Sequence, residues 1–358
     1  MAPTAASTIS ARRSSRRRTR ASGLTSLSTW GTLPLVTVTG GNSKEAAVSG
    51  TAHVLGRNGR TGSKANPADR EDTARRLLRS SVDKSYEPSI DIDWDAPLVE
   101  GKYGIVPERV SLYGTPLWDG LTEEQRITLS IHEFCSVARI GLWFEMILMQ
   151  MLLRYAYDRD PRRAHIQYAL VEIADECRHS MMFAKATERY GVPDYAPRRL
   201  THEQGRLMKT IGTGPAMFAG TLYVEEILDQ MQREGMRDER VQPLSRMINK
   251  IHVTEEARHV RYAREELQRI MPRTNYAERA WARYLTARIA YVVARNLIHP
   301  DVYRSVGIDP AVGRKAAMAN PHHHEMLRWS ARKLVPFLRE QKVVGGPTEA
   351  LWKRAHLI

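Results

Sequence analysis

Apolar residues recur at helical spacing along most of the chain after residue 120, and no segment there alternates as a half-buried strand does. The pattern predicts four long helices, at residues 122–157, 161–190, 215–234 and 241–270. Two shorter helical patterns follow, at residues 275–298 and 323–342. Thr122 is the expected N-cap of the first helix. We therefore expect an all-α fold, a four-helix bundle with additional helices.

The segments outside the bundle have a different composition. Residues 1–70 are rich in Ser, Thr, Gly, Ala and Arg without sustained periodicity, which indicates a disordered extension. Residues 71–120 contain Pro, Gly and several aromatic residues, as expected of an irregular segment that wraps a core. We divide the remainder into a helical bundle domain at 121–345 and a C-terminal tail at 346–358.

The net charge of +14 is concentrated near the beginning, because residues 1–43 contain six arginines and no acid. Such a tail could contact nucleic acid or anionic lipid, or act as a transit peptide. A solvated extension is the simpler interpretation, since no basic surface with interleaved aromatic residues follows it. The longest apolar stretch, "WFEMILMQMLL", is interrupted by Glu145 and Gln150 and is shorter than the roughly 20 residues that span a bilayer. We expect neither a nucleic-acid nor a membrane partner.

The chain has only two cysteines, Cys135 and Cys177. They are too few for a disulfide framework, a zinc finger or an iron–sulfur cluster, which favours a reducing compartment and a cytoplasmic location.

A Glu-x-x-His motif occurs twice. Only two of the twelve histidines have a glutamate three positions upstream, in "ECRH" (Glu176, His179) and again, further along the chain, in "EARH" (Glu256, His259). Residues i and i+3 project from nearly the same helix face, so each motif offers one carboxylate and one imidazole to a single point.

A lone glutamate precedes each motif at the same distance. Glu145 precedes Glu176 by as many positions as Glu225 precedes Glu256, whereas Glu226 breaks that spacing. Two helical hairpins packed face to face would bring four carboxylates and two imidazoles into the core, as in ferritin-like proteins that hold two iron or manganese ions. Four carboxylates neutralise two divalent cations. Without the cations, burial of the four carboxylates would be very costly.

A seventh candidate ligand lies on the same helix stripe. His252 is four residues before Glu256 and seven before His259, and its counterpart in the first copy of the repeat is Glu172. The surrounding charged residues could orient ligands or form ordinary ion pairs, and these are Asp175, Arg178, Asp229 and Arg258. His322, His323 and His324 point in different directions on a helix, and we expect them to form a solvated helix start rather than a metal site.

With these elements, residues 85–300 resemble the p-aminobenzoate N-oxygenase family of di-iron oxygenases. The family pattern is a Glu, a Glu-x-x-His, a further Glu and a His-x-x-x-Glu-x-x-His. Its seven positions are filled here by Glu145, Glu176, His179, Glu225, His252, Glu256 and His259. The additional histidine separates this pattern from ferritins, ribonucleotide reductase small subunits and acyl-carrier desaturases.

The resemblance implies two carboxylate-bridged iron ions, with O₂ as co-substrate and no catalytic residue beyond the metal ligands. The implied reaction oxygenates an amine nitrogen to hydroxylamine, nitroso or nitro, in a small or carrier-bound substrate. The sequence contains no flavin or nicotinamide motif and no cysteine cluster, so an external reductase is expected to supply electrons. A homodimer is also expected.

Other functions fit the same ligand set. They are a di-iron C–H hydroxylase or desaturase, a ferritin-like iron-handling protein, and a manganese–iron or dimanganese oxidase. Family membership does not fix the substrate.

Overall fold

The fold is seen in a computed structural model, which describes residues 69–358. This range is helical and contains no strand, only an isolated bridge between Tyr103 and Val241. The predicted all-α fold is therefore confirmed. The extension expected to be disordered, residues 1–70, lies almost wholly outside the described residues.

Four long helices form the centre of the molecule. They are α4 (Glu123–Tyr157), α5 (Ala164–Tyr190), α7 (Gly214–Gly235) and α8 (Pro243–Ile270). The predicted boundaries agree to within three residues. Thr122 caps α4 in a capping box with Gln125, as the sequence suggested. Gly191 ends α5 in the left-handed conformation, at a φ of +64°, where glycine is unstrained.

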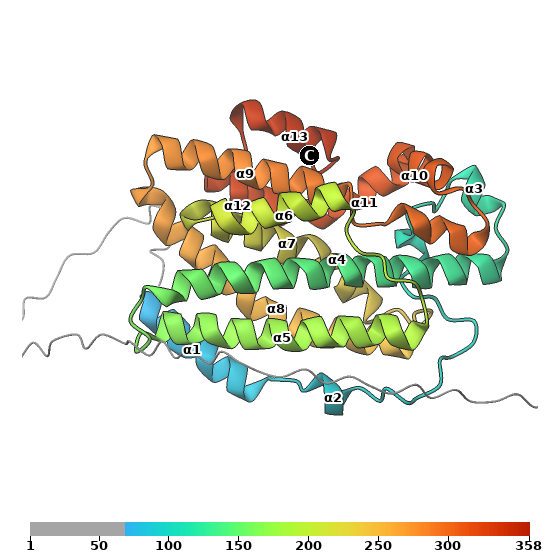
Figure 1. Cartoon of the computed structure of the whole chain (residues 1–358), viewed down its shortest axis with the longest axis horizontal. Coiled ribbons are helices and arrows are strands. Elements are labelled where there is room, and N and C mark those ends of the chain that lie inside the picture. The colour runs from blue at the N-terminus through green and yellow to red at the C-terminus, as the bar shows by residue number, and fades with distance from the viewer. Residues whose placement is uncertain (1–68) are drawn as a thin grey trace, which may run out of the picture. The chain divides into compact units, whose positions relative to one another are not determined.

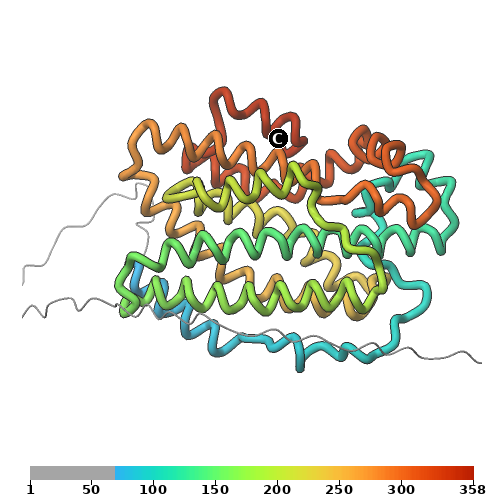
Figure 2. The backbone as a smooth tube through the Cα atoms, in the orientation of Figure 1, coloured from blue at the N-terminus to red at the C-terminus, as the bar shows by residue number. Residues whose placement is uncertain are grey.

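These helices form two antiparallel hairpins. α4 packs along α5, and α7 packs along α8. Figure 1 shows α4 and α5 lying side by side, and the tube in Figure 2 follows the chain from one hairpin into the other. Further contacts of α5 with α8 join the hairpins into a bundle of the ferritin-like type.

Additional helices cover the bundle. They are α1 (Arg70–Asp83), α2 (Pro88–Asp91), α3 (Pro116–Asp119), α6 (Arg199–Ile211), α9 (Tyr276–Ala294), α10 (Pro310–Ala319), α11 (Pro321–Ala331), α12 (Leu334–Glu340) and α13 (Glu349–Arg354), with short 3-10 turns at η1 (Pro107–Arg109), η2 (Met271–Arg273), η3 (Pro300–Val306) and η4 (Gly346–Thr348). The sequence pattern did not predict α6. It approaches α4 closely through Gly205, where a Cβ would lie 2.2 Å from the Trp143 ring.

Helix α1 lies in the segment that was expected to be irregular. Its apolar side is short, comprising Ala74 and Leu77, and hydrophobic periodicity is weak over such a length. Charged groups also fix it to the bundle: Arg70 donates to Glu266 over 2.9 Å, and the backbone N–H of Ala164 donates to Glu71 over 2.8 Å. The last helix, α13, buries Trp352 against Tyr223, with ring centroids 5.7 Å apart.

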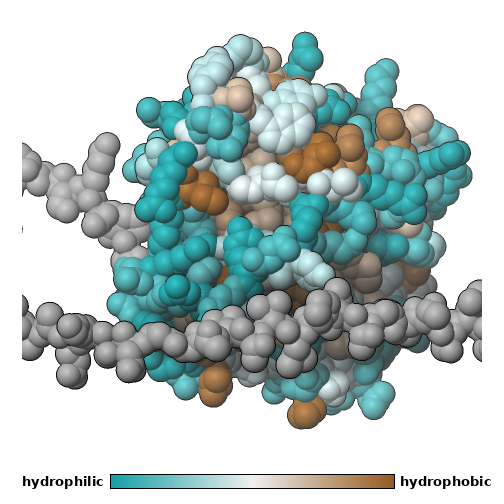
Figure 3. All heavy atoms as spheres, turned by 60° about the vertical axis from the view of Figure 1, so that its left-hand side comes forward, coloured by the Kyte–Doolittle hydropathy of each residue, from teal (hydrophilic) through white to brown (hydrophobic). Residues whose placement is uncertain are grey.

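Helix α4 is apolar and long enough to cross a membrane by length and composition alone. Half of its most apolar window is buried inside the molecule, and the core helix of a soluble protein passes the same test. The face turned forward in Figure 3 is covered mostly by hydrophilic side chains, with hydrophobic ones in separate small patches.

Candidate metal centre

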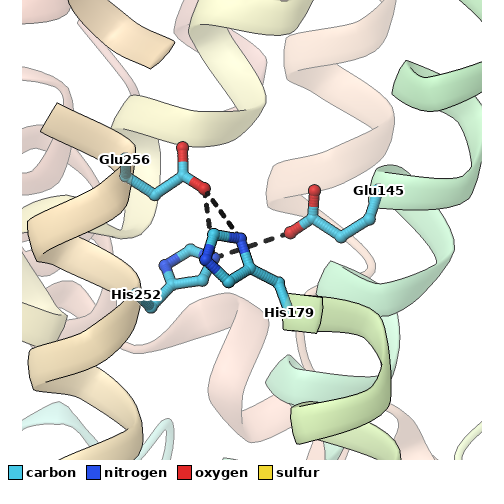
Figure 4. A group of neighbouring side chains, drawn as sticks. All are labelled: Glu145, His179, His252 and Glu256. Atoms are coloured by element: carbon cyan, nitrogen blue, oxygen red, sulfur yellow. Dashed lines mark ion pairs between the residues drawn. The ribbon is translucent and has the colours of Figure 1, made fainter. Parts of the chain in front are cut away.

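All seven residues singled out in the sequence come together in the bundle core. They are Glu145 from α4, Glu176 and His179 from α5, Glu225 from α7, and His252, Glu256 and His259 from α8. Every one is buried, with at most 7% of its surface exposed. Figure 4 shows four of these side chains converging from three helices.

The ligand atoms fall into two groups, each within 4.8 Å. One group contains Glu145, His179, His252 and Glu256, and the other contains Glu176, Glu225, Glu256 and His259. Glu256 belongs to both groups. Each group could hold one metal ion, with Glu256 shared between them.

The glutamates of the two motifs lie between the two imidazoles. Glu176 places Oε2 3.0 Å from His179 Nδ1 and Oε1 3.0 Å from His259 Nδ1. Glu256 places Oε1 3.3 Å from both of these nitrogens. Carboxylates in this position suit a bridge between two ions.

Each motif histidine is held from outside by an acid of the opposite hairpin. His179 Nε2 lies 2.8 Å from Glu255 of α8, and His259 Nε2 lies 3.1 Å from Asp175 of α5. An Nε2–H donated outward leaves the Nδ1 lone pair directed into the cluster, the tautomer that a metal requires.

His252 is oriented in the opposite sense. Its Nδ1 lies 3.0 Å from Gln232 Oε1, while Nε2 lies 3.5 Å from Oε1 of both Glu145 and Glu256. Its Nε2 therefore points into the group that contains Glu145.

Several buried ligand atoms of the cluster lack a hydrogen-bond partner, and two cations would supply one. Both carboxylate oxygens of Glu225, Oε2 of Glu256 and Nε2 of His252 are buried without a hydrogen-bond partner. Buried polar atoms in proteins are almost always paired, and unpaired carboxylates in an apolar interior are costly. The side chains thus fit a dinuclear centre with mixed carboxylate and imidazole ligands.

Protonation in the metal-free protein reflects this crowding. Burial and the charge of Glu176 raise the pKa of Glu145, and burial and the charge of Glu256 raise the pKa of Glu225. Burial alone would lower the pKa of His179, but its hydrogen bonds to Glu176, Glu255 and Glu256 raise it well above the ordinary value. Protons therefore take the place of cations in the cluster, and metal uptake must displace them.

The outer charged residues divide into two kinds. Arg258 donates to Asp175 over 3.2 Å, and Arg178 also contacts Asp175, so both arginines support the acid that holds His259. Asp229 instead pairs with Arg233 over 2.8 Å, away from the cluster.

Glu226 pairs with Arg264, so Glu225 and not Glu226 belongs to the cluster.

Two functional candidates escaped the sequence analysis. Glu255 was not assigned a role, although the shift that carries Glu176 onto Glu256 also carries Asp175 onto Glu255, so the internal repeat could have indicated it. Glu172 was noted only as the counterpart of His252. It is fully buried with Oε2 unpaired, and burial raises its pKa to about 8.

The three adjacent histidines do begin a helix, α11, but they do not form a solvated start as expected. His323 is buried, and His324 stacks on His356 with ring centroids 3.4 Å apart. His322 lies against Tyr113 instead, with ring centroids 4.9 Å apart, and local sequence pattern does not report such contacts between distant residues.

The sequence profile described as p-aminobenzoate N-oxygenase AurF matches residues 67–342. The chain belongs to this family. Membership in the AurF family and the buried cluster of carboxylates and imidazoles support the predicted dinuclear metal site. Uncharacterized proteins of Mycobacterium bovis and Mycobacterium tuberculosis are 32% identical over 225 residues, which is 61% of this chain. The chain spans only 66% of the length of these relatives.

Solved structures resemble this AurF-family chain more distantly. A mutant R2-like ligand-binding oxidase with an aerobically reconstituted Mn/Fe cofactor is 12% identical, with a TM-score of 0.37 over 80% of this chain and 90% of the other. The same kind of oxidase after photoconversion gives 12% identity and a TM-score of 0.38 over 81% and 90%. At this level the likeness carries no information about metal identity or activity.

Proposed function

We propose that this protein is a dinuclear non-haem iron oxygenase that oxygenates the nitrogen of an amine. The proposed iron ligands are the seven clustered residues, Glu145, Glu176, His179, Glu225, His252, Glu256 and His259. The observation that carries the proposal is the position of His252, whose Nε2 joins the group formed by Glu145, His179 and Glu256. This third imidazole is what separates the family pattern from other carboxylate bundles.

Iron is proposed over manganese from the donor set and from the family. Imidazoles favour iron over manganese, whereas an all-oxygen set would suit manganese as well. When bound, the two ions would supply O₂ activation, the redox chemistry that side chains alone do not perform.

The side chains would keep the centre ready for that chemistry. Asp175 and Glu255 hold His259 and His179 in the tautomer with a free Nδ1, and Gln232 orients His252. Glu176 and Glu256 are positioned to balance the charge of both ions. The seven residues are themselves buried, with at most 7% of their surface exposed, which would limit unproductive reactions with water.

Several predicted partners stay proposals. Within residues 69–358 no cluster of thiolates is present that could hold an iron–sulfur centre, since Cys135 is buried and Cys177 is exposed on a different helix. We therefore infer an external electron-donor reductase. A homodimer and a cytoplasmic location are expected on the grounds given by the sequence.

The test uses the iron-loaded full chain, chemically reduced and then exposed to O₂ with a panel of arylamines and aliphatic amines. Hydroxylamine, nitroso or nitro products are expected. Glu225→Gln should lose both iron and product, whereas the matched neighbour Glu226→Gln should keep both, because Glu226 faces Arg264. Products oxidised only at carbon would overturn N-oxygenation and favour a hydroxylase.

A further inference from the structure

An apolar cavity lies beside the candidate metal centre. It is lined mainly by α4 and α7, and four of the seven clustered residues form part of its wall: Glu145, Glu225, His252 and Glu256. The free space, including its solvent-open part, is about 1130 Å³. A molecule in this cavity would meet the metal centre directly, so we take it as the substrate site.

The walls away from the metal centre are almost entirely hydrocarbon and aromatic. Phe134, Ile140, Phe144, Leu148 and Met231 are typical of them. Burial of an alkyl or aryl group against such walls is favourable, whereas burial of an unpaired charge is strongly unfavourable.

Arg109 is the one lysine or arginine among the described residues that line the cavity. Its guanidinium is already paired with Glu234, through Nε to Oε2 at 2.6 Å and Nη2 to Oε1 at 3.0 Å. It also stacks over the Trp329 ring at 4.2 Å. Its charge is therefore balanced, and a substrate carboxylate would have to compete with Glu234 for it.

Thr221 is part of the cavity wall, and its hydroxyl has no hydrogen-bond partner. Thr221 Oγ1 is buried and unpaired, one helical turn before Glu225, and Thr221 as a whole is only 4% exposed. Apart from the clustered metal-binding candidates, no other side-chain nitrogen or oxygen of the cavity wall in residues 69–358 is in this state. A substrate N–H near the metal centre would satisfy it.

We infer that the substrate is an uncharged, weakly basic arylamine with an apolar body, bound with its amine near Thr221, and not an aminobenzoate or another carboxylate. An aliphatic amine would enter as an ammonium ion at neutral pH and would find no spare anion once two metal ions neutralise the carboxylates. This inference rests on the proposed N-oxygenation, because that reaction requires an amine at this position.

Binding is measured by calorimetry on the iron-loaded full chain, without reductant, so that no turnover occurs. 4-Butylaniline is expected to bind at least about tenfold more tightly than 4-aminobenzoate. Glu234→Gln should narrow this gap by strengthening 4-aminobenzoate binding, since Arg109 then loses its anionic partner. The control Glu325→Gln removes an exposed acid that pairs with Arg328, outside the cavity wall, and should leave the gap unchanged.

The role of Thr221 is tested with Thr221→Val, which keeps the side-chain shape but removes the hydroxyl. It should weaken 4-butylaniline several-fold and leave 4-butyltoluene, which has no amine, unchanged. Equal losses for both ligands would overturn the proposed contact.

Equal or tighter binding of 4-aminobenzoate to the unaltered protein would overturn the substrate inference. Product analysis separates this outcome from failure of the proposed function. If 4-butylaniline binds selectively but is oxidised only at carbon, the binding preference stands and N-oxygenation fails. If 4-aminobenzoate binds better and is converted to a nitroso or nitro product, N-oxygenation stands and the substrate inference fails.

Discussion

The two helical hairpins, α4–α5 and α7–α8, build the same half-site from different residues. Each contributes a lone glutamate and a Glu-x-x-His motif, and each supplies the acid that holds the histidine of the other hairpin. Asp175 of α5 reaches His259, and Glu255 of α8 reaches His179. The repeat therefore extends beyond the inner residues to their supports, and it ties the hairpins together through a reciprocal exchange.

At one position of the ligand stripe the two hairpins carry different chemical groups. α8 has His252 where α5 has Glu172. His252 lines the apolar cavity, whereas Glu172 lies outside its wall. Under the proposed function, the symmetric residues would hold the metal ions, and the asymmetric position would lie on the side where substrate binds.

The largest effect is expected from the motif glutamates. Glu176→Ala or Glu256→Ala should reduce the metal content from two ions to fewer than one per chain and lower the melting temperature, because each carboxylate serves both halves. Elemental analysis with thermal unfolding measures this. Retention of two ions by either variant would show that the halves are not equivalent.

Substitution of the two acids that hold the motif histidines, Asp175 and Glu255, should have a smaller effect on metal binding, equal for the two. Asp175→Asn and Glu255→Gln should each weaken metal affinity by about 10–100-fold, the usual cost of losing such a support. Competition with a metal chelator gives the affinities. A loss confined to one variant would break the reciprocal exchange.

Substitutions at the asymmetric position, His252 in α8 and Glu172 in α5, should have different effects on the metal centre. His252→Ala should keep the fold and most of the metal, since six candidate ligands remain, but should change the optical spectrum after reduction and exposure to O₂. Glu172→Gln should leave that spectrum unchanged, because Glu172 belongs to neither ligand group. An unaltered spectrum for His252→Ala would make His252 a core residue and weaken the proposed function.

The same two residues should give the metal-free protein opposite pH dependences. Burial lowers the pKa of His252 from 6.5 to about 4, so the unfolded chain binds the extra proton and stability rises as pH increases from 4 to 6.5. Burial raises the pKa of Glu172 from 4.5 to about 8, so the folded chain binds the extra proton and stability falls as pH increases from 4.5 to 8.

Each slope is at most about 1.4 kcal/mol per pH unit. His252→Gln should remove the rise in unfolding free energy with pH, and Glu172→Gln should remove the fall. Urea unfolding of chelator-treated protein between pH 5 and 8 measures both, and identical profiles for the two variants would contradict the assignment.

The smallest effect is expected outside both hairpins. Deletion of residues 1–68 should leave metal content and melting temperature unchanged, since α1 begins afterwards at Arg70. Deletion through Asp83 serves as the contrast, because it removes the contacts of Arg70 with Glu266 and of Glu71 with Ala164. A shorter chain lacking only residues 1–68 that fails to load metal would contradict this prediction.

The bundle and the seven clustered residues were predictable because their information is local and repeated. Helical periodicity gives α4, α5, α7 and α8, and the constant shift between the two copies of the repeat selects Glu225 over its neighbour Glu226. Glu255 was equally available as the counterpart of Asp175, but its acidic neighbour Glu256 fills the motif position and masks it in the sequence.

Other features depend on contacts that no local pattern records. His323 is buried, and the neighbouring His324 stacks against His356 of the C-terminal segment. The charge state of the cavity depends on whether Glu234 reaches Arg109, which lies far earlier in the chain. Both features can be recognised only in the three-dimensional structure.

The proposed dependence of the buried carboxylates on metal has a consequence for the amount of the protein in the cell. A newly made chain that finds no metal keeps its acids protonated or paired with imidazolium groups, and opens more readily than the loaded form. Proteases act on opened chains, so the unloaded copies should be degraded first. We expect the steady-state amount of this protein to follow the cellular iron supply even where its synthesis is constant, which pulse–chase labelling under iron limitation can measure.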